Sequence, residues 1–581
     1  MKHAAETDAL PDVIVGGGSA GCVLAARLTE DARNHVLLIE AGMDTPPGAV
    51  PAEIRDSYPM PLFFGERYIW PGLAAYTNRE QGAAARTYEQ ARVMGGGSSI
   101  NVQAANRGLP RDYDGWAALG AEGWSFEDVL PYFCRLESDL DFDSNQHGRE
   151  GPIAIRRILP QSWPAFAHAA ARAFDGAGLE RRLDQNADFE DGTFPPAFSN
   201  RNDQRVSAAD AYLDVATRKR PNLEIRAETR VERVVFEGRR ATGVILRGPD
   251  GQRKSVRAKR VIVAAGALQS PALLLRSGIG KADHLRKLGI EAVIDLPGVG
   301  QNLRDHPALT FCQFLPPHLR LAMDYRRSSL LCARFSSNVP GCVPSDMYVS
   351  ASARAGWHSL GSRLALYFLW CNQPYSVGSL ELRSADPNDY PEIDLNLLSD
   401  ERDMKRMVDA VRRLAATLVC DALNPHPEDF FPAAYSARMK KLSAYGVANR
   451  IVTSLLARGL DLPAPLRHEL VRRFLLGGKS FADILSDDRA LCDFVRRNVF
   501  GVWHPSGTCR MGSVRDPLAV VDPAGRVIGS ENLYVSDASI MPRLPTANTN
   551  IPTIMIAEKI SDGLRERAAP VLRSESAGPV R

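Results

Sequence analysis

The order of apolar runs, glycines and polar positions at the front of the chain predicts one βαβ unit. The run over 13–15 is too short for a helix and rich in β-branched residues, which is typical of a buried parallel strand. It is followed by a helical segment over 20–28 and by a second apolar run over 36–39 that ends in Glu40. Between the first strand and the helix stands a G-x-G-x-x-G pattern made of Gly16, Gly18 and Gly21.

In such a unit each part has a role in binding a dinucleotide. The glycines let backbone approach a pyrophosphate, the N-terminus of the helix faces it, and the acid after the second strand accepts hydrogen bonds from an adenosine ribose. Because strand, helix, second strand and acid are all in register, the pattern favours a ligand with an ADP moiety over a tight turn without a ligand.

Later segments repeat this alternation and extend the same predicted sheet. The run over 260–270 is typical of a buried strand that leads into a helix with Pro271 near its start. Near the end of the chain, 532–535 predicts a closing strand and 552–560 a helix that begins near a proline. A sheet built from the first and last strands makes this domain discontinuous. A further helix is predicted over 206–217, with Ser207 as a candidate N-cap.

Between about residues 315 and 500 the pattern changes. Alternation over 363–370 and 378–383 predicts an antiparallel sheet, and 402–418 carries a helical apolar stripe. This change of periodicity indicates a second domain inserted into the first. We interpret the arginines of the helix as a solvated face rather than a site; they are Arg402, Arg406, Arg412 and Arg413.

Size and composition narrow the class of protein. A length of 581 residues suggests roughly three or four structural units. The apolar content of 45% and charged content of 24% are typical of a globular protein with a large core. The net charge of +3, with no basic block, favours neither a nucleic acid nor a membrane as partner. The chain shows no apolar signal-peptide region near its N-terminus and no apolar run of spanning length.

The cysteines indicate the compartment. They number nine, are scattered and form no C-x-x-C, so neither a disulfide framework nor a zinc site is indicated, and no other metal-binding constellation is visible. Reduced thiols fit a cytoplasmic enzyme.

Two polar residues near the end of the chain are candidates for chemistry. His504 follows Trp503, and its local sequence is equally compatible with a core histidine and with a catalytic one. Asn548 lies in TANTN, at a predicted strand-to-helix junction where side chains point into a crevice. An imidazole and an amide together can handle an alcohol, since one removes the proton and the other holds the oxygen. Other histidines are expected at the surface, among them His147, His284 and His426.

A second glycine segment, ARVMGGGSSIN over 91–101, exposes backbone amides with few side chains in the way. This suits close approach to a cofactor, although a flexible loop has the same composition.

Taken along its whole length, the sequence resembles the glucose-methanol-choline (GMC) family of flavin oxidoreductases. The resemblance lies in DVIVGGGSAGCVLAARL, ARVMGGGSSIN, AGALQSPALLLRSGIG, GVGQNLRDHP, WHPSGTCRMG and VSDASIMPRLPTANTNIPTIMIAEKISD, in the family's order. Within the family, the segments FFGERYIWP, NRGLPRDYDGW, NADFEDGTFPPAF, DLNLLSD and GVWHPSG are closest to oxidases of aromatic and furanic alcohols.

The resemblance implies an α/β chain, α+β overall, with a discontinuous Rossmann-like FAD-binding domain and an inserted substrate domain built on an antiparallel sheet flanked by helices. The expected FAD-binding segments are 10–160, 200–314 and 500–567, and the substrate-binding segments are 161–199 and 315–499. Residues 568–581 are expected to form a flexible tail.

The resemblance also assigns residues to roles. His504 is implied as the catalytic histidine and Asn548 as its partner, and a pocket is expected between Trp370, Val502 and Trp503. Val502 is also a candidate for the wall that controls the reaction with dioxygen. FAD is expected to bind without a covalent link, because Ile100 stands where covalent members carry histidine. The residues implied in FAD binding are Gly16, Gly18, Ser19, Ala20, Gly21, Glu40, Ala41, Gly97, Asn101, Val102, Val231, Trp503, Asp537, Ala538, Asn550 and Ile551.

The implied activity is oxidation of a primary aromatic or furanic alcohol to the aldehyde, and on to the acid through the hydrated aldehyde, with hydride passing to flavin N5 and dioxygen reduced to hydrogen peroxide. Alternatives are a dehydrogenase that uses a quinone or another acceptor and a hydroxynitrile lyase on the same fold. A nicotinamide-binding or purely structural protein is disfavoured by the second glycine segment and by the NTNIPT junction. The chain is expected to be a monomer or homodimer.

Overall fold

A computed structural model describes residues 10–59, 62, 65–322, 325–433, 441–474 and 480–566. The predicted tail over 568–581 lies outside these residues. The described chain has mixed helices and sheets arranged around two main sheets, which confirms the predicted fold class.

A parallel five-stranded sheet carries the predicted βαβ unit, with its strands in the order β10-β2-β1-β14-β25. The register aligns Val15 with Ile39 on one side and with Val263 on the other, so the carboxyl ends of three strands meet where the glycine turn begins. Every residue of the four strands other than β10 is buried, because helices cover the sheet. The bounds are β1 Asp12–Val15, β2 Val36–Ile39, β10 Leu223–Arg226, β14 Arg260–Val263 and β25 Leu533–Val535.

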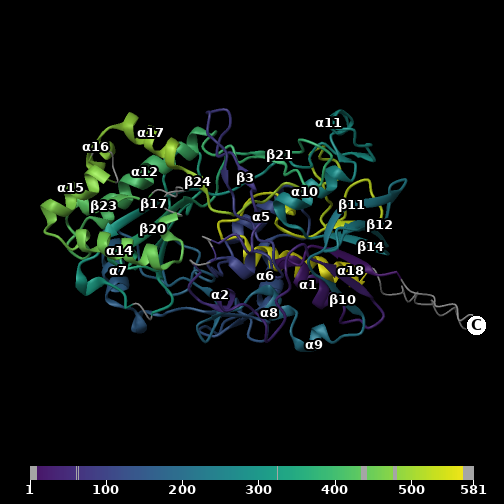
Figure 1. Cartoon of the computed structure of the whole chain (residues 1–581), viewed down its shortest axis with the longest axis horizontal. Helices are drawn as coiled ribbons and strands as arrows, with labels where there is room; N and C mark the ends of the chain where they lie inside the picture. Colours follow the sequence, from purple (N-terminus) through teal and green to yellow (C-terminus); the bar gives the residue numbers. More distant parts are fainter. Residues whose placement is uncertain are drawn as a thin grey trace, which may run out of the picture.

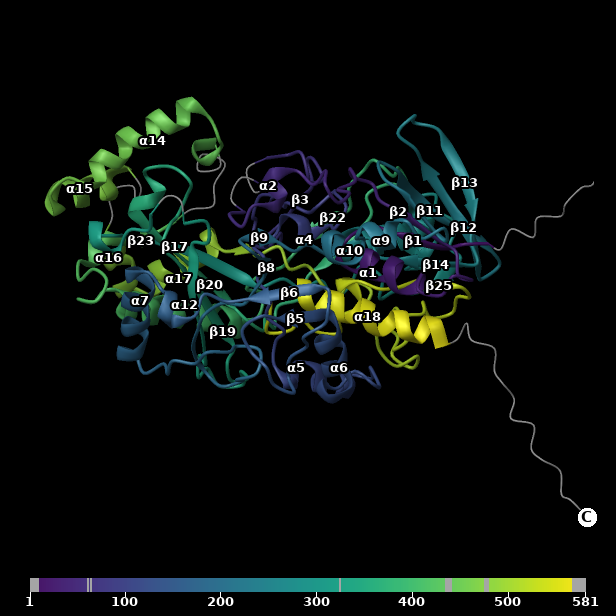
Figure 2. The same cartoon turned by 90° about the horizontal axis from the view of Figure 1, so that it is seen from below.

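Three helices hold this sheet to the rest of the chain. Helix α18 (Asn550–Glu566) packs against α1 (Ser19–Leu28), and the two lie side by side in Figure 2. Helix α10 (Gly266–Arg276) contains Pro271, which has no N–H to donate and so leaves the carbonyl of Ala267 free. The Thr508 hydroxyl donates to that carbonyl at 2.6 Å and thereby joins α10 to the loop that follows His504.

The second main sheet has seven strands, and every pairing in it is antiparallel. Tyr348 pairs with Trp370, Trp370 with Ala308, and Ala308 with Phe500, so these side chains form one row across four strands. The bounds are β7 Gly192–Phe194, β17 Pro307–Phe314, β18 Ser329–Phe335, β19 Met347–Ser352, β20 Leu364–Cys371, β23 Phe430–Pro432 and β24 Phe500–Gly501.

Helices surround this sheet at the end of the molecule remote from α1 (Figure 1). They are α7 Ala165–Gly176, α12 Glu401–Leu418, α14 Val447–Leu460, α15 Ala464–Phe474, α16 Phe481–Ser486 and α17 Asp488–Asn498. Two strands of the seven-stranded sheet, β17 and β24, lie just outside the segment 315–499 that was expected to build this sheet. The division into domains at the stated residues stays a prediction.

The chain also forms several smaller sheets, ladders and helices. An antiparallel sheet is formed by β11 Arg230–Glu237, β12 Arg240–Arg247 and β13 Arg253–Arg257. A mixed four-stranded sheet is formed by β5 Glu137–Asp139, β6 Ile153–Arg156, β8 Phe198–Arg201 and β9 Gln204–Arg205. Two-stranded ladders are β3 Ala74–Ala75 with β4 Arg86–Thr87, β15 Ile279–Gly280 with β16 Ile294–Asp295, and β21 Ser379–Glu381 with β22 Glu392–Asp394. The shorter helices are α2 Ala52–Arg55, α4 Gly97–Ile100, α5 Pro110–Ala118, α6 Phe126–Leu136, α8 Ala208–Tyr212, α9 Val215–Arg218 and α11 Ala282–Lys287. Single 3₁₀ turns are η1 Pro160–Ser162, η2 Pro317–Leu319, η3 Gly361–Arg363, η4 Pro427–Asp429 and η5 Ala538–Ile540.

Three local predictions were wrong in part. The helix expected over 206–217 is two helices: Ser207 caps the first as predicted, but Asp214 accepts the N–H of Thr217 at 2.7 Å and starts a second one. The strand predicted over 378–383 is β21, Ser379–Glu381, which pairs with β22 and lies outside the seven-stranded sheet. Arg406 is not solvated; it is fully buried and paired with Asp346 and Asp403.

In the described residues, no helix is both long and apolar enough to cross a membrane.

Candidate active site

The structure brings His504 and Asn548 together although 44 residues separate them. His504 follows β24 in a loop, and Asn548 lies just before α18. The amide Nδ2 of Asn548 is 3.0 Å from Nε2 of His504. The backbone N–H of Asn548 donates to the Asn106 side-chain oxygen at 3.1 Å, which fixes the loop ahead of the helix. Asn548 is therefore held in place by Asn106 while it faces His504.

A second histidine, His306, fixes the protonation state of His504. It is fully buried just before β17, and burial lowers the pKa of His306 to about 3, so its imidazole is neutral. Its Nε2 lies 2.9 Å from the Asn372 carbonyl oxygen and must carry the hydrogen. Its Nδ1 is consequently an acceptor, and it lies 2.9 Å from Nδ1 of His504.

His504 must then donate from Nδ1. Burial, together with His306, lowers the pKa of His504 well below its ordinary value, so this ring is also neutral. A neutral imidazole with its hydrogen on Nδ1 has a lone pair on Nε2. The Nε2 of His504 therefore faces Asn548 as an unprotonated acceptor, which is the state that a general base needs.

The carboxylate of Asp305 holds the backbone around both histidines. Its Oδ1 accepts the N–H of His306 at 2.8 Å and of His504 at 3.0 Å, and the Tyr88 hydroxyl donates to Oδ2 at 2.5 Å. Burial raises the pKa of Asp305 to about 7. Gly501 is required here, because a Cβ at that position would lie 2.1 Å from Oδ2.

Trp503 adopts a left-handed backbone conformation with φ of 61°, which is strained for a residue with a side chain. The Trp503 indole N–H donates to Glu89 Oε2 at 2.9 Å and helps to hold that conformation. The Trp503 side chain and the His504 backbone are thus each held by a buried acid, Glu89 and Asp305.

The three predicted wall residues lie in one apolar cluster. Trp370 and Val502 are buried, and Trp503 packs against them. Trp370 stacks on Tyr348 with ring centroids 4.5 Å apart. The cross-strand row described above supplies Ala308 and Phe500 to the same cluster. This cluster borders His504 through Trp503, so an apolar surface lies beside the histidine.

A separate cavity of about 180 Å³ lies at the carboxyl ends of the parallel strands. The glycine turn and the second glycine segment meet there: a Cβ on Gly96 would lie 2.7 Å from the Gly18 Cα. Such an approach leaves room for a flat, phosphate-bearing ligand only if both segments lack side chains. Nine of the predicted FAD-binding residues line this cavity: Gly16, Gly18, Ser19, Glu40, Ala41, Gly97, Val231, Asp537 and Ala538.

The remaining predicted FAD-binding residues do not line it. Gly21 has a packing role, because a Cβ there would lie 1.8 Å from the Gly16 carbonyl oxygen. Asn550 accepts the Ser19 hydroxyl at 2.8 Å and joins α18 to the glycine turn. Asn101 accepts from Arg205 at 2.7 Å. The others are Ala20 and Ile551, which are buried, Val102, which is 44% exposed, and Trp503.

Two buried acids brace the cavity. Glu40 accepts the N–H of Gly17 at 2.8 Å and of Gly42 at 2.7 Å, so it fixes the turn itself. Asp537 accepts from the Ser270 hydroxyl at 2.6 Å and from the Gly266 N–H at 2.8 Å. Burial raises the pKa of both carboxyls.

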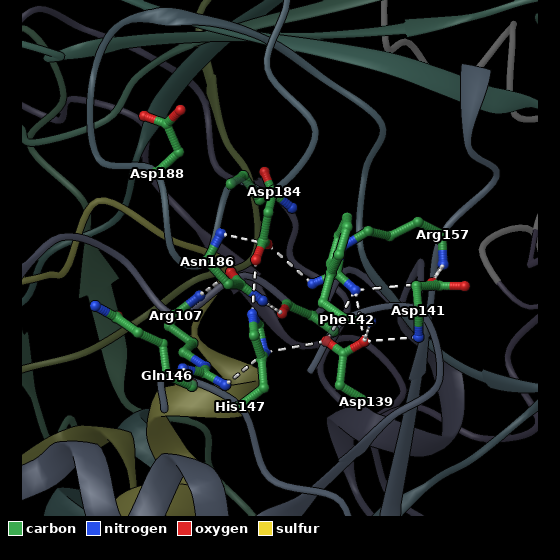
Figure 3. A network of polar contacts seen from close by, with 12 residues as sticks. Arg107, Asp139, Asp141, Phe142, Gln146, His147, Arg157, Asp184, Asn186 and Asp188 are labelled. Carbon is green, nitrogen blue, oxygen red and sulfur yellow. Dashed lines mark hydrogen bonds and ion pairs between the residues drawn. The ribbon is translucent and has the colours of Figure 1, made fainter. Parts of the chain in front are cut away.

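A buried cluster of charges lies around His147, which was expected at the surface (Figure 3). Its side chain is 1% exposed. Nδ1 lies 2.9 Å from Glu137 and 3.1 Å from Asp139, and Nε2 lies 2.6 Å from Asp184. Burial opposes the charged form, but the hydrogen bonds to these acids outweigh it and raise the pKa of His147 to about 10. His147 is therefore an imidazolium at neutral pH.

Three of these residues, Glu137, Asp139 and His147, lie close enough together to hold a metal ion. However, Arg107 pairs with Glu137, and Arg157 lies 2.8 Å from Asp139. Two guanidinium groups and a protonated imidazole already balance the carboxylates, and a metal would need the imidazole neutral. The geometry is that of an ion network rather than of a metal centre.

Two residues of the site were missed by the sequence analysis, namely Asp305 and His306. Both stand in GVGQNLRDHP, a segment that carried the family resemblance, so a signal was present. The sequence could not show that this segment would contact His504.

The fold and the site are those of a nucleotide-dependent oxidoreductase: a glycine-lined cavity lies at the parallel sheet and, separate from it, a neutral histidine lies beside an apolar cluster. Comparisons agree. Profiles described as GMC oxidoreductase match residues 10–308 and 374–557. The chain belongs to the GMC oxidoreductase family and is an FAD-dependent enzyme.

The relatives include oxidases and dehydrogenases. The chain is 44% identical to 5-(hydroxymethyl)furfural oxidase of Methylovorus sp. (strain MP688), over 97% of this chain and 100% of the relative. It is 34% identical to oxygen-dependent choline dehydrogenase of Brucella anthropi, over 97% and 96%. Among solved structures, pyridoxine 4-oxidase from Mesorbium loti aligns with a TM-score of 0.77 at 28% identity, covering 96% of this chain and 99% of that one.

Proposed function

We propose that the protein is an oxidase of primary aromatic or furanic alcohols, giving the aldehyde and, through the hydrated aldehyde, the acid. The observation that carries the proposal is the unprotonated Nε2 of His504, held 3.0 Å from the Asn548 amide beside an apolar cluster. The similarity to 5-(hydroxymethyl)furfural oxidase over nearly the whole chain supports the substrate class.

His504 would act as the base for the alcohol. A hydroxyl that replaces the contact between His504 and Asn548 would meet an acceptor and a donor only 3.0 Å apart. His504 would take the proton on Nε2, while the amide of Asn548 would hold the oxygen as its charge develops. The resulting imidazolium would still donate from Nδ1 to neutral His306, so the charge forms without any rearrangement of the ring.

Part of FAD, its ADP half, would lie in the cavity at the carboxyl ends of the strands, where two glycine segments approach without side chains. The nine lining residues named above would hold its ADP half and pyrophosphate. When bound, FAD would supply the hydride acceptor and the route for electrons to dioxygen, so hydrogen peroxide would be the second product. We propose that it binds without a covalent link, because Ile100 replaces the histidine of covalent members. Release of all flavin on denaturation would test this.

The cluster of Trp370, Tyr348 and Val502 supports a flat apolar substrate. Stacked aromatic rings offer broad contact area and few polar groups, which suits a benzylic or furanic ring. A second candidate function is a dehydrogenase that uses another electron acceptor. It is supported by the choline dehydrogenase relatives, which are less similar to this chain than the furfural oxidase is.

The test combines one variant with one substrate panel. We expect the wild-type enzyme to lose its yellow colour with benzyl alcohol in the absence of oxygen and to form peroxide when oxygen is added. We expect His504→Ala to slow the anaerobic step by about 10²- to 10⁴-fold, since the base is lost. Near-normal reduction in this variant would contradict the role of His504. Oxidation without oxygen uptake would favour the dehydrogenase, and an unbleached flavin would favour a lyase.

Two further properties belong to the proposal. All nine cysteines are free thiols, which supports a reducing, cytoplasmic location. We propose a monomer or homodimer, with a small alcohol or aldehyde hydrate and dioxygen as the reacting partners.

A further inference from the structure

Helix α14 (Val447–Leu460) exposes five of its six large apolar residues, while its buried side carries Thr453, Ala457 and Leu460. Val447 is 77% exposed, Ile451 57% and Leu455 59%, whereas Thr453 and Ala457 are fully buried. A surface helix normally shows the opposite arrangement, with its apolar stripe toward the core. The five large apolar side chains on its exposed side are Val447, Ile451, Val452, Leu455 and Leu456, and we call them the α14 patch.

The patch is not a random scatter of exposed apolar residues. Spacings of four residues put 447, 451 and 455 in one line along the helix, with 452 and 456 beside it. Leu462 and Leu466, in the turn to α15 and at its start, are 39% and 57% exposed. These seven are almost half of the fifteen exposed large apolar residues in the described part of the chain. Single exposed residues need no explanation, but a continuous stripe marks an interaction surface.

The charges on α14 itself are all positive, and the first acid beyond it, Asp461, is already paired with Arg320 and Arg363. The segment 441–460 contains Lys441, Arg450 and Arg458, all of them exposed, and no acidic residue. The expectation that no membrane is a partner rested on the net charge of +3 and on the absence of a basic block; the three basic residues here are spread along the segment and form no block in the sequence. The surface therefore combines aliphatic side chains with positive charge.

The position of the helix leaves it accessible. In Figures 1 and 2, α14 and α15 lie at the outer edge of the molecule, at the end remote from α1 and the parallel sheet. A flat partner can reach α14 there without covering the cavity at the carboxyl ends of the strands.

We propose that α14 docks on an anionic membrane surface, with the α14 patch among the acyl chains and Lys441, Arg450 and Arg458 at the phosphate level. A helix with an apolar face and basic flanks lies in the plane of the membrane interface and does not span it. A second copy would bring the same basic, acid-free helix and no charge complement, whereas lipid phosphates supply one.

The experiment measures sedimentation of the full-length, FAD-loaded enzyme with vesicles of phosphatidylcholine alone or with about 30% phosphatidylglycerol, a fraction that gives a negative surface potential. We expect binding to the anionic vesicles that weakens with salt. Ile451→Glu with Leu455→Glu should lower the affinity more than about tenfold, because two side chains can no longer be buried. Arg450→Gln with Arg458→Gln should lower it about fivefold or more and reduce its salt dependence.

A matched control replaces exposed apolar residues elsewhere. Leu183 and Val514 are 52% and 65% exposed and lie outside α14. Leu183→Glu with Val514→Glu should bind vesicles as the wild type does. All variants should keep wild-type melting temperature and kcat/KM in detergent-free buffer, since none of the changed residues belongs to the candidate active site.

Three results would overturn the proposal. One is a wild-type enzyme that does not sediment with anionic vesicles. Another is equal binding by the Ile451→Glu, Leu455→Glu variant. The third is a dimer, measured by light scattering, that the same variant dissociates, because the α14 patch would then pair two copies of the chain.

Discussion

Replacing His306 with phenylalanine tests how the proton of the site is placed. In the structure, Nδ1 of His306 accepts the Nδ1–H of His504 over 2.9 Å and leaves the lone pair of His504 on Nε2. Phenylalanine keeps a flat ring, somewhat larger than imidazole, but offers no acceptor. The Nδ1–H of His504 then loses its partner, and the tautomer with the hydrogen on Nε2, which cannot accept a proton from the alcohol, becomes accessible.

The size of the effect follows from the charge that forms during catalysis. Once His504 takes the alcohol proton, its Nδ1–H donates as part of a cation, and such a hydrogen bond contributes about 1.5–3 kcal/mol. Each 1.36 kcal/mol of barrier changes a rate by a factor of about ten. We therefore expect His306→Phe to slow alcohol oxidation by roughly tenfold to a hundredfold.

The assay is the rate of anaerobic flavin bleaching at saturating benzyl alcohol, followed by stopped flow. FAD content and melting temperature show whether the variant is folded and loaded. His306→Asn is the matched variant, because its amide oxygen can replace the Nδ1 acceptor and should restore part of the rate. A wild-type rate in His306→Phe would refute the reasoning, and equal loss in both variants would assign His306 a packing role.

Three further predictions concern other groups. Burial raises the pKa of Asp305 to about 7, and the Asp305 anion would favour the imidazolium of His504, so we expect kcat to rise through about pH 7. Asp305→Asn should flatten this rise. An unchanged pH profile in that variant would contradict the role of Asp305. A Cβ on Gly21 would lie 1.8 Å from a backbone oxygen, so Gly21→Ala should yield protein without FAD, whereas Gly176→Ala, which meets no atom within 4 Å, should bind FAD normally in absorbance spectra. The folded pKa of His147, about 10, is above its ordinary 6.5, so its contribution of a few kcal/mol is complete below pH 6.5 and is lost as pH rises through about 10. Urea unfolding should show that loss in the wild type and a flatter curve in His147→Gln; parallel curves would exclude a charged His147.

Some features of this protein follow from short stretches of sequence. The strand–glycine–helix unit over 12–28 was predicted closely, because strand length, glycine spacing and helix propensity are local properties. The same holds for Arg260–Val263 and Leu533–Val535, whose apolar runs must be buried on both faces of a parallel sheet. The pairing of His504 with Asn548 was predicted through the family resemblance, since neither residue announces its role locally.

The sequence by itself determined the nucleotide-binding unit, the mixed fold and the candidates for chemistry. Only the tertiary structure decided the environment of each side chain. Burial beside His306 makes His504 a neutral acceptor, burial among three acids makes His147 a cation, and burial between two acids removes Arg406 from solvent. The charge state of a side chain and the direction of its hydrogen bonds depend on neighbours that are far away in sequence. The local sequence therefore could not show that His504 is neutral and His147 charged.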